Sequence, residues 1–309
     1  MLQEKPYREA EARLWRFADA RPSETRVRLP RIGTEVRVQR VGSGPPVLFI
    51  HGGPNAGSTW ALMVGRLPGF ECLLVDRPGT GLSDPLPAVP TAQALPALGD
   101  RFVGDVLDGL GIERADLVAS SLGGYLGLRS AAAEPARIGR MVQMACPAFV
   151  PGMKTPMFMR LMSLSAVRWL MGVLPPSPKV ARDLLRQIGH GASLDADRIP
   201  DVFIDWYVDL QRHTDTMLHD GDAIGNFISL SGMRREVGLS EDFLRSVRTP
   251  TFFLWGADDT FGGEEVARAV AGLMPDAKLE LVPGAGHLPW IDDPERAARV
   301  TQEFLRPAA

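Results

Sequence analysis

Residues 117–125 read LVASSLGGY, an apolar run followed by two serines and two glycines. An apolar run that ends in small residues is typical of a buried strand that turns sharply into a helix. A turn of this kind exposes a serine only where small residues lie two positions before and two positions after it. Ser121 has Ala119 and Gly123 at these positions, whereas Ser120 would have a bulky residue at both. The spacing therefore selects Ser121 as the exposed hydroxyl.

Strand-like runs on either side of this stretch alternate with helical patterns. Continuous apolar runs that end in small or polar residues lie at 45–53, 70–79, 138–147, 249–259 and 277–287. Runs of this kind suit parallel strands that are buried on both faces. Helical periodicity is found at 58–67, 93–110, 122–133, 263–274 and 293–305. The alternation predicts an α/β fold with a mostly parallel, doubly wound sheet, and residues 25–30 and 34–41 add an antiparallel edge pair.

The rhythm of strands and helices stops at Pro147 and resumes near residue 236. Residues 148–235 contain no convincing strand but seven methionines, and we interpret them as a helical cap inserted into a core of 25–147 and 236–309. Residues 1–24 are predicted to be a helical extension that packs on the body through an apolar stripe of Leu14, Trp15 and Ala18.

Composition limits the class of protein. The net charge of −3 (34 basic against 37 acidic residues) gives no attraction to nucleic acid. The first residues lack the apolar segment of a secretion signal, and no apolar run is long enough to span a membrane. Cys72 and Cys146 lack metal-ligand spacing and are expected to be buried thiols. We therefore expect a cytoplasmic protein with a small-molecule partner, and the sequence is compatible with a homodimer.

Glycines after the strand at 45–50 provide an oxyanion site for a serine nucleophile. A tetrahedral intermediate requires backbone N–H donors opposite the nucleophile, and glycine lets the chain approach closely. We assign these donors to Gly53 and to Leu122, the residue after Ser121; Pro54 has no N–H group. His51 is expected to brace this loop through its side chain rather than to act in catalysis.

A base and an acid are expected after later strands, in the order Ser, Asp, His. Among the five histidines only His287 follows a strand on a glycine-rich loop, whereas His190, His213 and His219 lie in the insertion. The strand-like run before that of His287, residues 249–259, ends in two carboxylates, Asp258 and Asp259. We favour Asp259 as the partner that orients the imidazole.

Five ordered motifs, HGGP, DRPGTGLSD, ASSLGG, LWGADD and GHLPWIDDPE, resemble those of the α/β-hydrolase superfamily. The resemblance covers about 25–147 and 236–305 and places the variable cap at 148–235. It maps the nucleophile onto Ser121, the base onto His287 and the acid onto the GADD position. It also implies no cofactor or metal, and Asp76 in the second motif has no catalytic role.

Departures from individual branches of this superfamily narrow the expected chemistry. Dehalogenases and epoxide hydrolases carry aspartate where Ser121 stands, and proline iminopeptidases carry a glycine-tryptophan-serine elbow. Meta-cleavage C–C hydrolases often have tryptophan after the base, where this chain has Leu288. We therefore predict a carboxylic ester hydrolase that forms an acyl-enzyme with a hydrophobic small-molecule ester. C–C hydrolysis, acyl transfer by the same triad, and a slow-turnover ligand-binding receptor are the alternatives.

The methionine-rich cap suggests an adaptable apolar roof over the pocket. We predict that Met157, Met162 and Trp206 from the cap, and Leu288 beside the base, line the substrate pocket.

Overall fold

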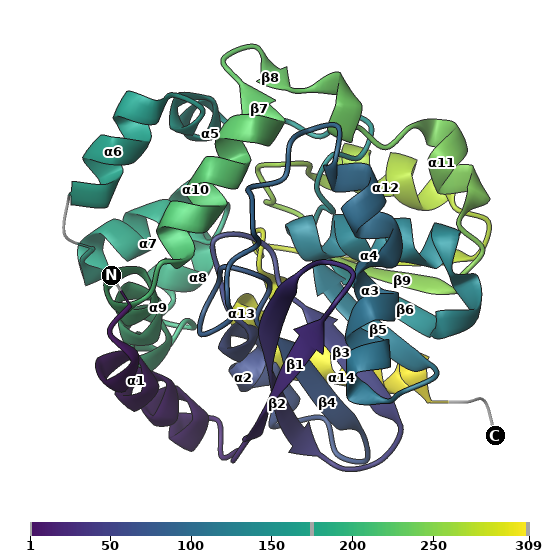
Figure 1. The fold of residues 1–309 in the computed structure, drawn as a ribbon, viewed down its shortest axis with the longest axis horizontal. Helices are drawn as coiled ribbons and strands as arrows, with labels where there is room; N and C mark the ends of the chain where they lie inside the picture. Colours follow the sequence, from purple (N-terminus) through teal and green to yellow (C-terminus); the bar gives the residue numbers. More distant parts are fainter. Residues whose placement is uncertain (1, 174–175, 307–309) are drawn as a thin grey trace.

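An eight-stranded sheet forms the centre of the structure, a computed structural model that describes residues 2–173 and 176–306 (Figure 1). In spatial order its strands are β1 (Ser23–Leu29), β2 (Thr34–Gly42), β4 (Glu71–Val75), β3 (Pro46–Ile50), β5 (Ala115–Ser120), β6 (Ile138–Met144), β9 (Thr251–Gly256) and β10 (Ala277–Val282). β2 pairs antiparallel with β1 and β4, and the pairs from β4 to β10 are parallel. The predicted α/β architecture and the antiparallel edge pair are confirmed.

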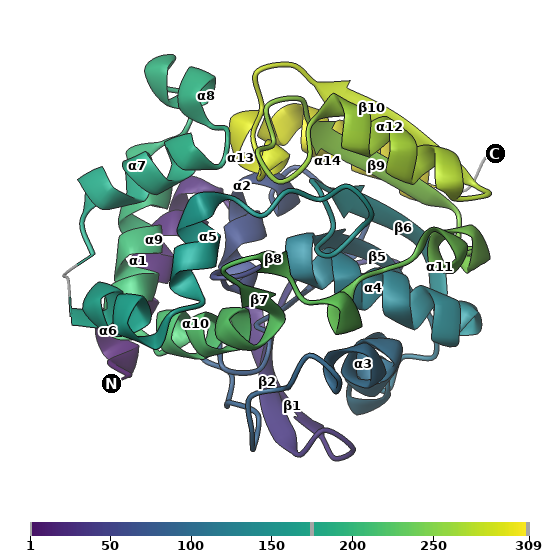
Figure 2. The same ribbon diagram turned by 90° about the horizontal axis from the view of Figure 1, so that it is seen from above.

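Two hydrophobic clusters lie on opposite faces of the sheet because neighbouring strand residues point in opposite directions. In β3, Val47 and Phe49 belong to one cluster, and Leu48 and Ile50 to the other. The first cluster contains α1 (Glu4–Phe17), α2 (Ala61–Val64), α13 (Pro289–Asp292) and α14 (Pro294–Leu305); the second contains α3 (Leu95–Leu110), α4 (Ser121–Ala133) and α12 (Glu264–Leu273). Figure 2 shows α3 and α4 on one side of β5 and β6, with α14 on the other.

Six helices form most of the described part of the insertion, which lies between β6 and the last part of the core. They are α5 (Met157–Met162), α6 (Ser165–Val173), α7 (Pro178–Gln187), α8 (Gly191–Asp195), α9 (Asp201–His213) and α10 (Thr216–Phe227). A short hairpin of β7 (Ile228–Ser229) and β8 (Gly232–Met233) follows. The sequence did not predict this hairpin because strands of two residues are too short to show a period of two. The short helix α11 (Glu241–Ser246) leads back to β9.

The N-terminal helix α1 lies between the core and the cap. It packs along α9, beside which it is seen in Figure 1, and Leu14, Trp15 and Ala18 are buried as expected. On its core side, Glu11 forms a buried ion pair with Arg37 of β2, 2.7 Å between Oε1 and Nη2. The N-terminal helix therefore contacts both the cap, through α9, and the core, through β2.

None of the described helices is long and apolar enough to cross a membrane.

Candidate active site

Ser121 lies at the turn between β5 and α4 in a strained backbone conformation. Its φ of +53° is in the left-handed region, which non-glycine residues rarely occupy. The turn fits only because its neighbours are small: a Cβ at Gly123 would lie 2.2 Å from the Ile50 carbonyl oxygen, and one at Gly52 would lie 2.6 Å from the Ser121 Cβ. Ser120, by contrast, is fully buried in the strand end. The hydroxyl of Ser120 is therefore not exposed.

His287 and Asp259 form a buried hydrogen-bonded pair. The Nδ1 atom of His287 lies 2.8 Å from Oδ2 of Asp259. The backbone N–H of Cys146 donates to the same carboxylate oxygen (3.0 Å), and the N–H of Phe261 donates to Oδ1 (2.9 Å). Asp258 is exposed instead. The geometry therefore brings Asp259, the favoured carboxylate, against the imidazole, where it fixes Nδ1 and leaves Nε2 for other contacts.

Ser121, His287, Gly53 and Leu122 line one cavity. The other lining side chains are mainly apolar: Cys146, Ala148, Phe149, Met153, Met159, Ala223, Ile224, Phe227, Ile228 and Phe261, with Asp220 as an additional carboxylate. Burial, and then the neighbouring Asp259 carboxylate, raise the pKa of the Cys146 thiol well above its usual range. Cys146 therefore stays protonated at neutral pH, and Ser121 is the candidate nucleophile in this cavity.

The four predicted pocket residues do not line this cavity, and this prediction requires correction. Met157 is 65% exposed, Met162 is partly buried away from the cavity, and Trp206 is fully buried in the contact of α9 with α1. Leu288 packs against the cluster on the α14 side of the sheet. Composition indicated an apolar roof, but the face that each helix presents depends on tertiary packing. Met153 and Met159 occupy the predicted role instead.

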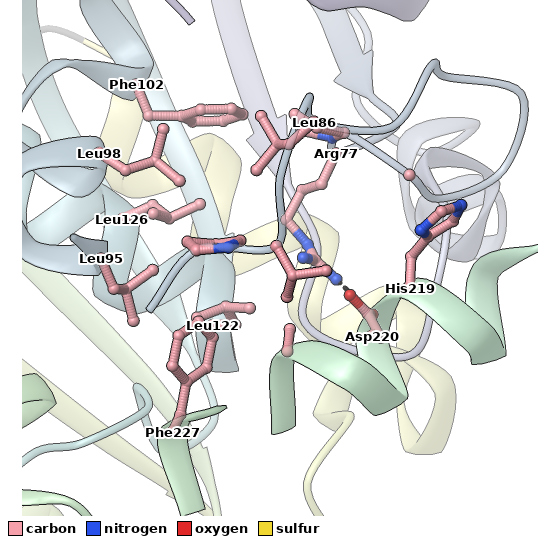
Figure 3. Close-up of a pocket in the computed structure, with 15 residues that line it drawn as sticks. Arg77, Leu86, Leu95, Leu98, Phe102, Leu122, Leu126, His219, Asp220 and Phe227 are labelled. Carbon is pink, nitrogen blue, oxygen red and sulfur yellow. Dashed lines mark hydrogen bonds and ion pairs between the residues drawn. The ribbon is translucent and has the colours of Figure 1, made fainter. Parts of the chain in front are cut away.

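A second cavity (Figure 3) adjoins the first. Four residues line both cavities: Leu122, Asp220, Ala223 and Phe227. Figure 3 shows apolar side chains of α3 and α4 on one side, Leu95, Leu98, Phe102 and Leu126, and the ion pair of Arg77 with Asp220 on the other. The candidate site is therefore an apolar space in two compartments with a charged pair at the partition.

Arg77 and Asp220 connect the cap to the loop that carries Gly53. Their Nη2 and Oδ2 atoms are 2.7 Å apart, and both side chains are more than nine-tenths buried. Arg77 also donates to the carbonyl oxygens of His51 and Gly52, each at 3.0 Å. Sequence reasoning missed both residues: Arg77 lay in a motif interpreted as a structural loop, and Asp220 had no signal in a helix of the cap.

His51 braces the glycine loop as predicted. Its Nδ1 lies 2.6 Å from the Gly52 carbonyl oxygen, and its Nε2 accepts the backbone N–H of Arg77 at 3.1 Å. Burial, reinforced by the Arg77 charge, lowers the pKa of His51 well below its ordinary value. Asp76 is likewise structural, because its carboxylate accepts from Arg37 and from the backbone N–H groups of Gly57 and Leu82.

The remaining histidines differ in their surroundings. His219 lines the second cavity, and His213 contacts Gln3 at 2.8 Å between Nδ1 and Oε1. His190 of the insertion is fully buried against Asp292. Nothing in the spacing of the sequence links His190 to the loop of His287, so this pair was missed.

Comparison with known proteins agrees with the fold. The model of the alpha/beta hydrolase family matches residues 47–300. The chain belongs to this family.

Two curated relatives of this chain are named as hydrolases of 2-hydroxy-6-oxo carboxylates. The 2-hydroxy-6-oxononadienedioate/2-hydroxy-6-oxononatrienedioate hydrolase of Paraburkholderia phymatum is 28% identical over 88% of this chain and 92% of its own. The 2-hydroxy-6-oxo-6-phenylhexa-2,4-dienoate hydrolase of Burkholderia cepacia is 27% identical over 87% and 91%.

Two solved structures share the fold over nearly the whole chain. Carboxylesterase CesB from Bacillus subtilis has a TM-score of 0.75 with 19% identity, covering 98% of both chains. The 2-hydroxy-6-oxo-6-phenylhexa-2,4-dienoate hydrolase from Rhodococcus has a TM-score of 0.76 with 16% identity, covering 93% of this chain and all of that one. At these identities the likeness concerns the fold alone.

Proposed function

We propose that this alpha/beta hydrolase cleaves carboxylic esters of neutral, apolar small molecules through an acyl-enzyme. Ser121 is the nucleophile, His287 the base and Asp259 the acid that orients it. The backbone N–H groups of Gly53 and Leu122 form the oxyanion site. The contact of His287 with Asp259 and the shared cavity of His287 with Ser121 support these roles.

In this mechanism His287 Nε2 takes the proton of the Ser121 hydroxyl as its oxygen attacks the ester carbonyl carbon. The tetrahedral oxyanion accepts hydrogen bonds from Gly53 and Leu122, and the Asp259 carboxylate stabilises the imidazolium. Collapse expels the alcohol oxygen, which takes the proton from His287. Water then attacks the acyl-enzyme with His287 again as base, which releases the acid and the free Ser121 hydroxyl.

The charge around the cavity is the observation that favours a neutral substrate. The carboxylate of Asp220 lines both compartments. It forms an ion pair with the buried Arg77, so the charge of this guanidinium is already neutralised. A substrate carboxylate beside this pair would lose its hydration and compete with Asp220 for Arg77, which is costly in a buried site. An acyl chain or an aromatic ring instead matches the apolar walls.

C–C bond hydrolysis is the second candidate, and the curated relatives favour it. Both are named as hydrolases of 2-hydroxy-6-oxo acids and are similar over nearly nine-tenths of this chain. These substrates carry at least one carboxylate, for which a binding cation is required. In this chain Arg77 could serve only by exchanging Asp220 for the substrate, and Leu288 follows the base. These two features support the ester hydrolase as our first choice.

A fluorophosphonate probe and a substrate panel test the proposal. We expect the probe to label the wild type and not Ser121→Ala. Among p-nitrophenyl esters, kcat/KM should rise from acetyl to medium-length acyl chains and be low for a succinyl monoester of similar length. A 2-hydroxy-6-oxo-dienoate is assayed in parallel by loss of its absorbance.

Each outcome of this panel selects one function. Faster turnover of the dienoate than of every ester would overturn the first choice in favour of C–C hydrolysis. Faster transfer to an added alcohol than to water would indicate an acyltransferase, and labelling without turnover of any substrate would indicate a ligand-binding receptor. Equal labelling of Ser121→Ala would contradict the role of this serine.

A further inference from the structure

His190 of the cap and Asp292 of α13 form a second buried histidine–aspartate pair behind the loop of His287. His190 is fully buried, and its Nδ1 lies 2.9 Å from both oxygens of Asp292. Its Nε2 accepts the backbone N–H of Leu288 at 3.1 Å. The Asp292 Oδ2 accepts the backbone N–H of Gly286 at 2.9 Å. The pair therefore binds the residues immediately before and after His287.

The backbone of the same cap segment binds the base itself. The N–H of His287 donates to the carbonyl oxygen of Ile188 at 2.9 Å. Three consecutive N–H groups, those of Gly286, His287 and Leu288, are thus held by the segment at 188–190 and by Asp292. Each bond fixes one peptide plane of a glycine-rich loop that would otherwise have wide conformational freedom.

This cap segment also touches the loop of the acid. Thr260 Oγ1 donates to the Gln187 carbonyl oxygen at 3.0 Å. Gly189, at φ +99°, approaches so closely that a Cβ there would lie 2.1 Å from the Asp258 carbonyl oxygen and 3.0 Å from the Gly286 Cα. The segment therefore packs against both the loop of Asp259 and the loop of His287.

We propose that His190, with Asp292, is a positioning residue that fixes His287 against Asp259 and the nucleophile, so that the cap forms part of the catalytic apparatus. The proposal rests on the roles proposed above for Ser121 and His287. His190 does not act as a second base, because both of its ring nitrogens are occupied and it lines neither cavity.

Two variants and one control test this role. His190→Ala removes both side-chain bonds, and Asp292→Asn keeps the shape but exchanges an acceptor for a donor facing Nδ1. His213→Ala is the matched control, because His213 is another hydrogen-bonded cap histidine whose partner, Gln3, precedes α1. Circular dichroism and thermal unfolding establish that each variant is folded at the assay temperature.

The kinetic readout separates positioning from binding or stability. A displacement of the base by about 1 Å lowers turnover by about 100-fold. We therefore expect kcat on p-nitrophenyl butyrate, and the rate of fluorophosphonate labelling, to fall by about 10- to 100-fold in both variants. KM should stay nearly constant, because the cavity walls are unchanged. His213→Ala should keep the wild-type values.

A spectroscopic readout keeps the test independent of the substrate. In protein labelled with ¹⁵N-histidine, the low-field Nδ1–H resonance of His287 should broaden or shift in His190→Ala and Asp292→Asn, but not in His213→Ala. If His190→Ala does not fold, Asp292→Asn decides alone. Folded variants with unchanged labelling, turnover and His287 resonance would overturn the positioning role, whereas an unlabelled wild type would overturn the proposed function.

Discussion

The two buried histidine–aspartate pairs use the same chemical groups at nearly the same distance. Nδ1 to carboxylate is 2.8 Å in His287–Asp259 and 2.9 Å in His190–Asp292. What differs is the second ring nitrogen. In His190 it accepts a backbone N–H, whereas His287 lines the cavity of Ser121. A histidine–aspartate contact thus identifies a base only when Nε2 is free to meet a substrate or nucleophile.

The origins of the two pairs also differ. His287 and Asp259 come from loops after neighbouring strands of the same sheet, β10 and β9. His190 and Asp292 come from the cap and from α13, and their contact joins the insertion to the core. The first pair carries the proposed proton transfer, and the second transmits the position of the cap to that pair.

The largest contrast between the pairs is expected for asparagine substitutions. Asp259→Asn should lower kcat by about 10⁴-fold, because the amide would hold His287 in the wrong tautomer. Asp292→Asn should cost at most about 100-fold, the scale of a displaced group. Stopped-flow or steady-state kcat on p-nitrophenyl butyrate, with thermal unfolding as control, measures both. Equal losses would show that the two pairs do not differ in kind.

Substitution of Asp220 tests whether the Arg77–Asp220 pair, a second contact between cap and core, controls substrate specificity. Asp220→Asn leaves the buried Arg77 charge without its counter-charge, so the free energy of unfolding in urea should fall by about 3 kcal/mol. The freed guanidinium should also favour an anionic substrate, raising kcat/KM for the succinyl ester relative to butyrate. Asp222→Asn, on the same helix with a partly exposed partner, is the control. An unchanged preference for neutral esters would contradict a role of Asp220 in excluding carboxylates.

The smallest effect is expected for the pH dependence of stability at His51, a buried histidine whose ring contacts a backbone carbonyl and a backbone N–H instead of a carboxylate. Because burial lowers its pKa, the folded state stays unprotonated where the unfolded chain, with a pKa of about 6.5, takes up a proton. The unfolded state then binds more protons, so stability is present above this pH and is lost as pH falls. We expect an extra slope of up to about 1.4 kcal/mol per pH unit below pH 6.5. Urea unfolding from pH 7 to 5 should show this slope in the wild type and not in His51→Asn, and parallel curves would contradict it.

The placement of the candidate site residues at the strand ends could be predicted from the sequence because it depends on local rules. Small residues around Ser121, glycines after β3 and a carboxylate and a histidine after later strands each follow from turn geometry. The parallel sheet then brings them to one edge. No local rule of this kind separates Asp259 from Asp258; the structure separates them by burying the former and exposing the latter.

The contribution of the cap could not be predicted in the same way. Met157 and Met159 are two positions apart on α5, yet Met157 faces solvent and Met159 faces the cavity. The choice between them depends on how α5 rests on the core. His190 and Asp292 are 102 positions apart, and no local pattern links them. Contacts between an insertion and its host are set by tertiary packing, which periodicity does not encode.

The place of α1 has a consequence for the order in which the chain folds. This helix precedes the whole sheet in the chain, but its partner α9 spans Asp201–His213, so their contact closes a loop that includes the sheet strands up to β6. Contacts of such long sequence separation form slowly, because the entropy of loop closure is lost before they stabilise the chain. During synthesis, the apolar stripe of α1 therefore stays exposed until most of the cap has emerged. Deletion of α1 should make nascent chains less prone to early aggregation. In the folded protein the same deletion should expose the face of α9 that α1 covers.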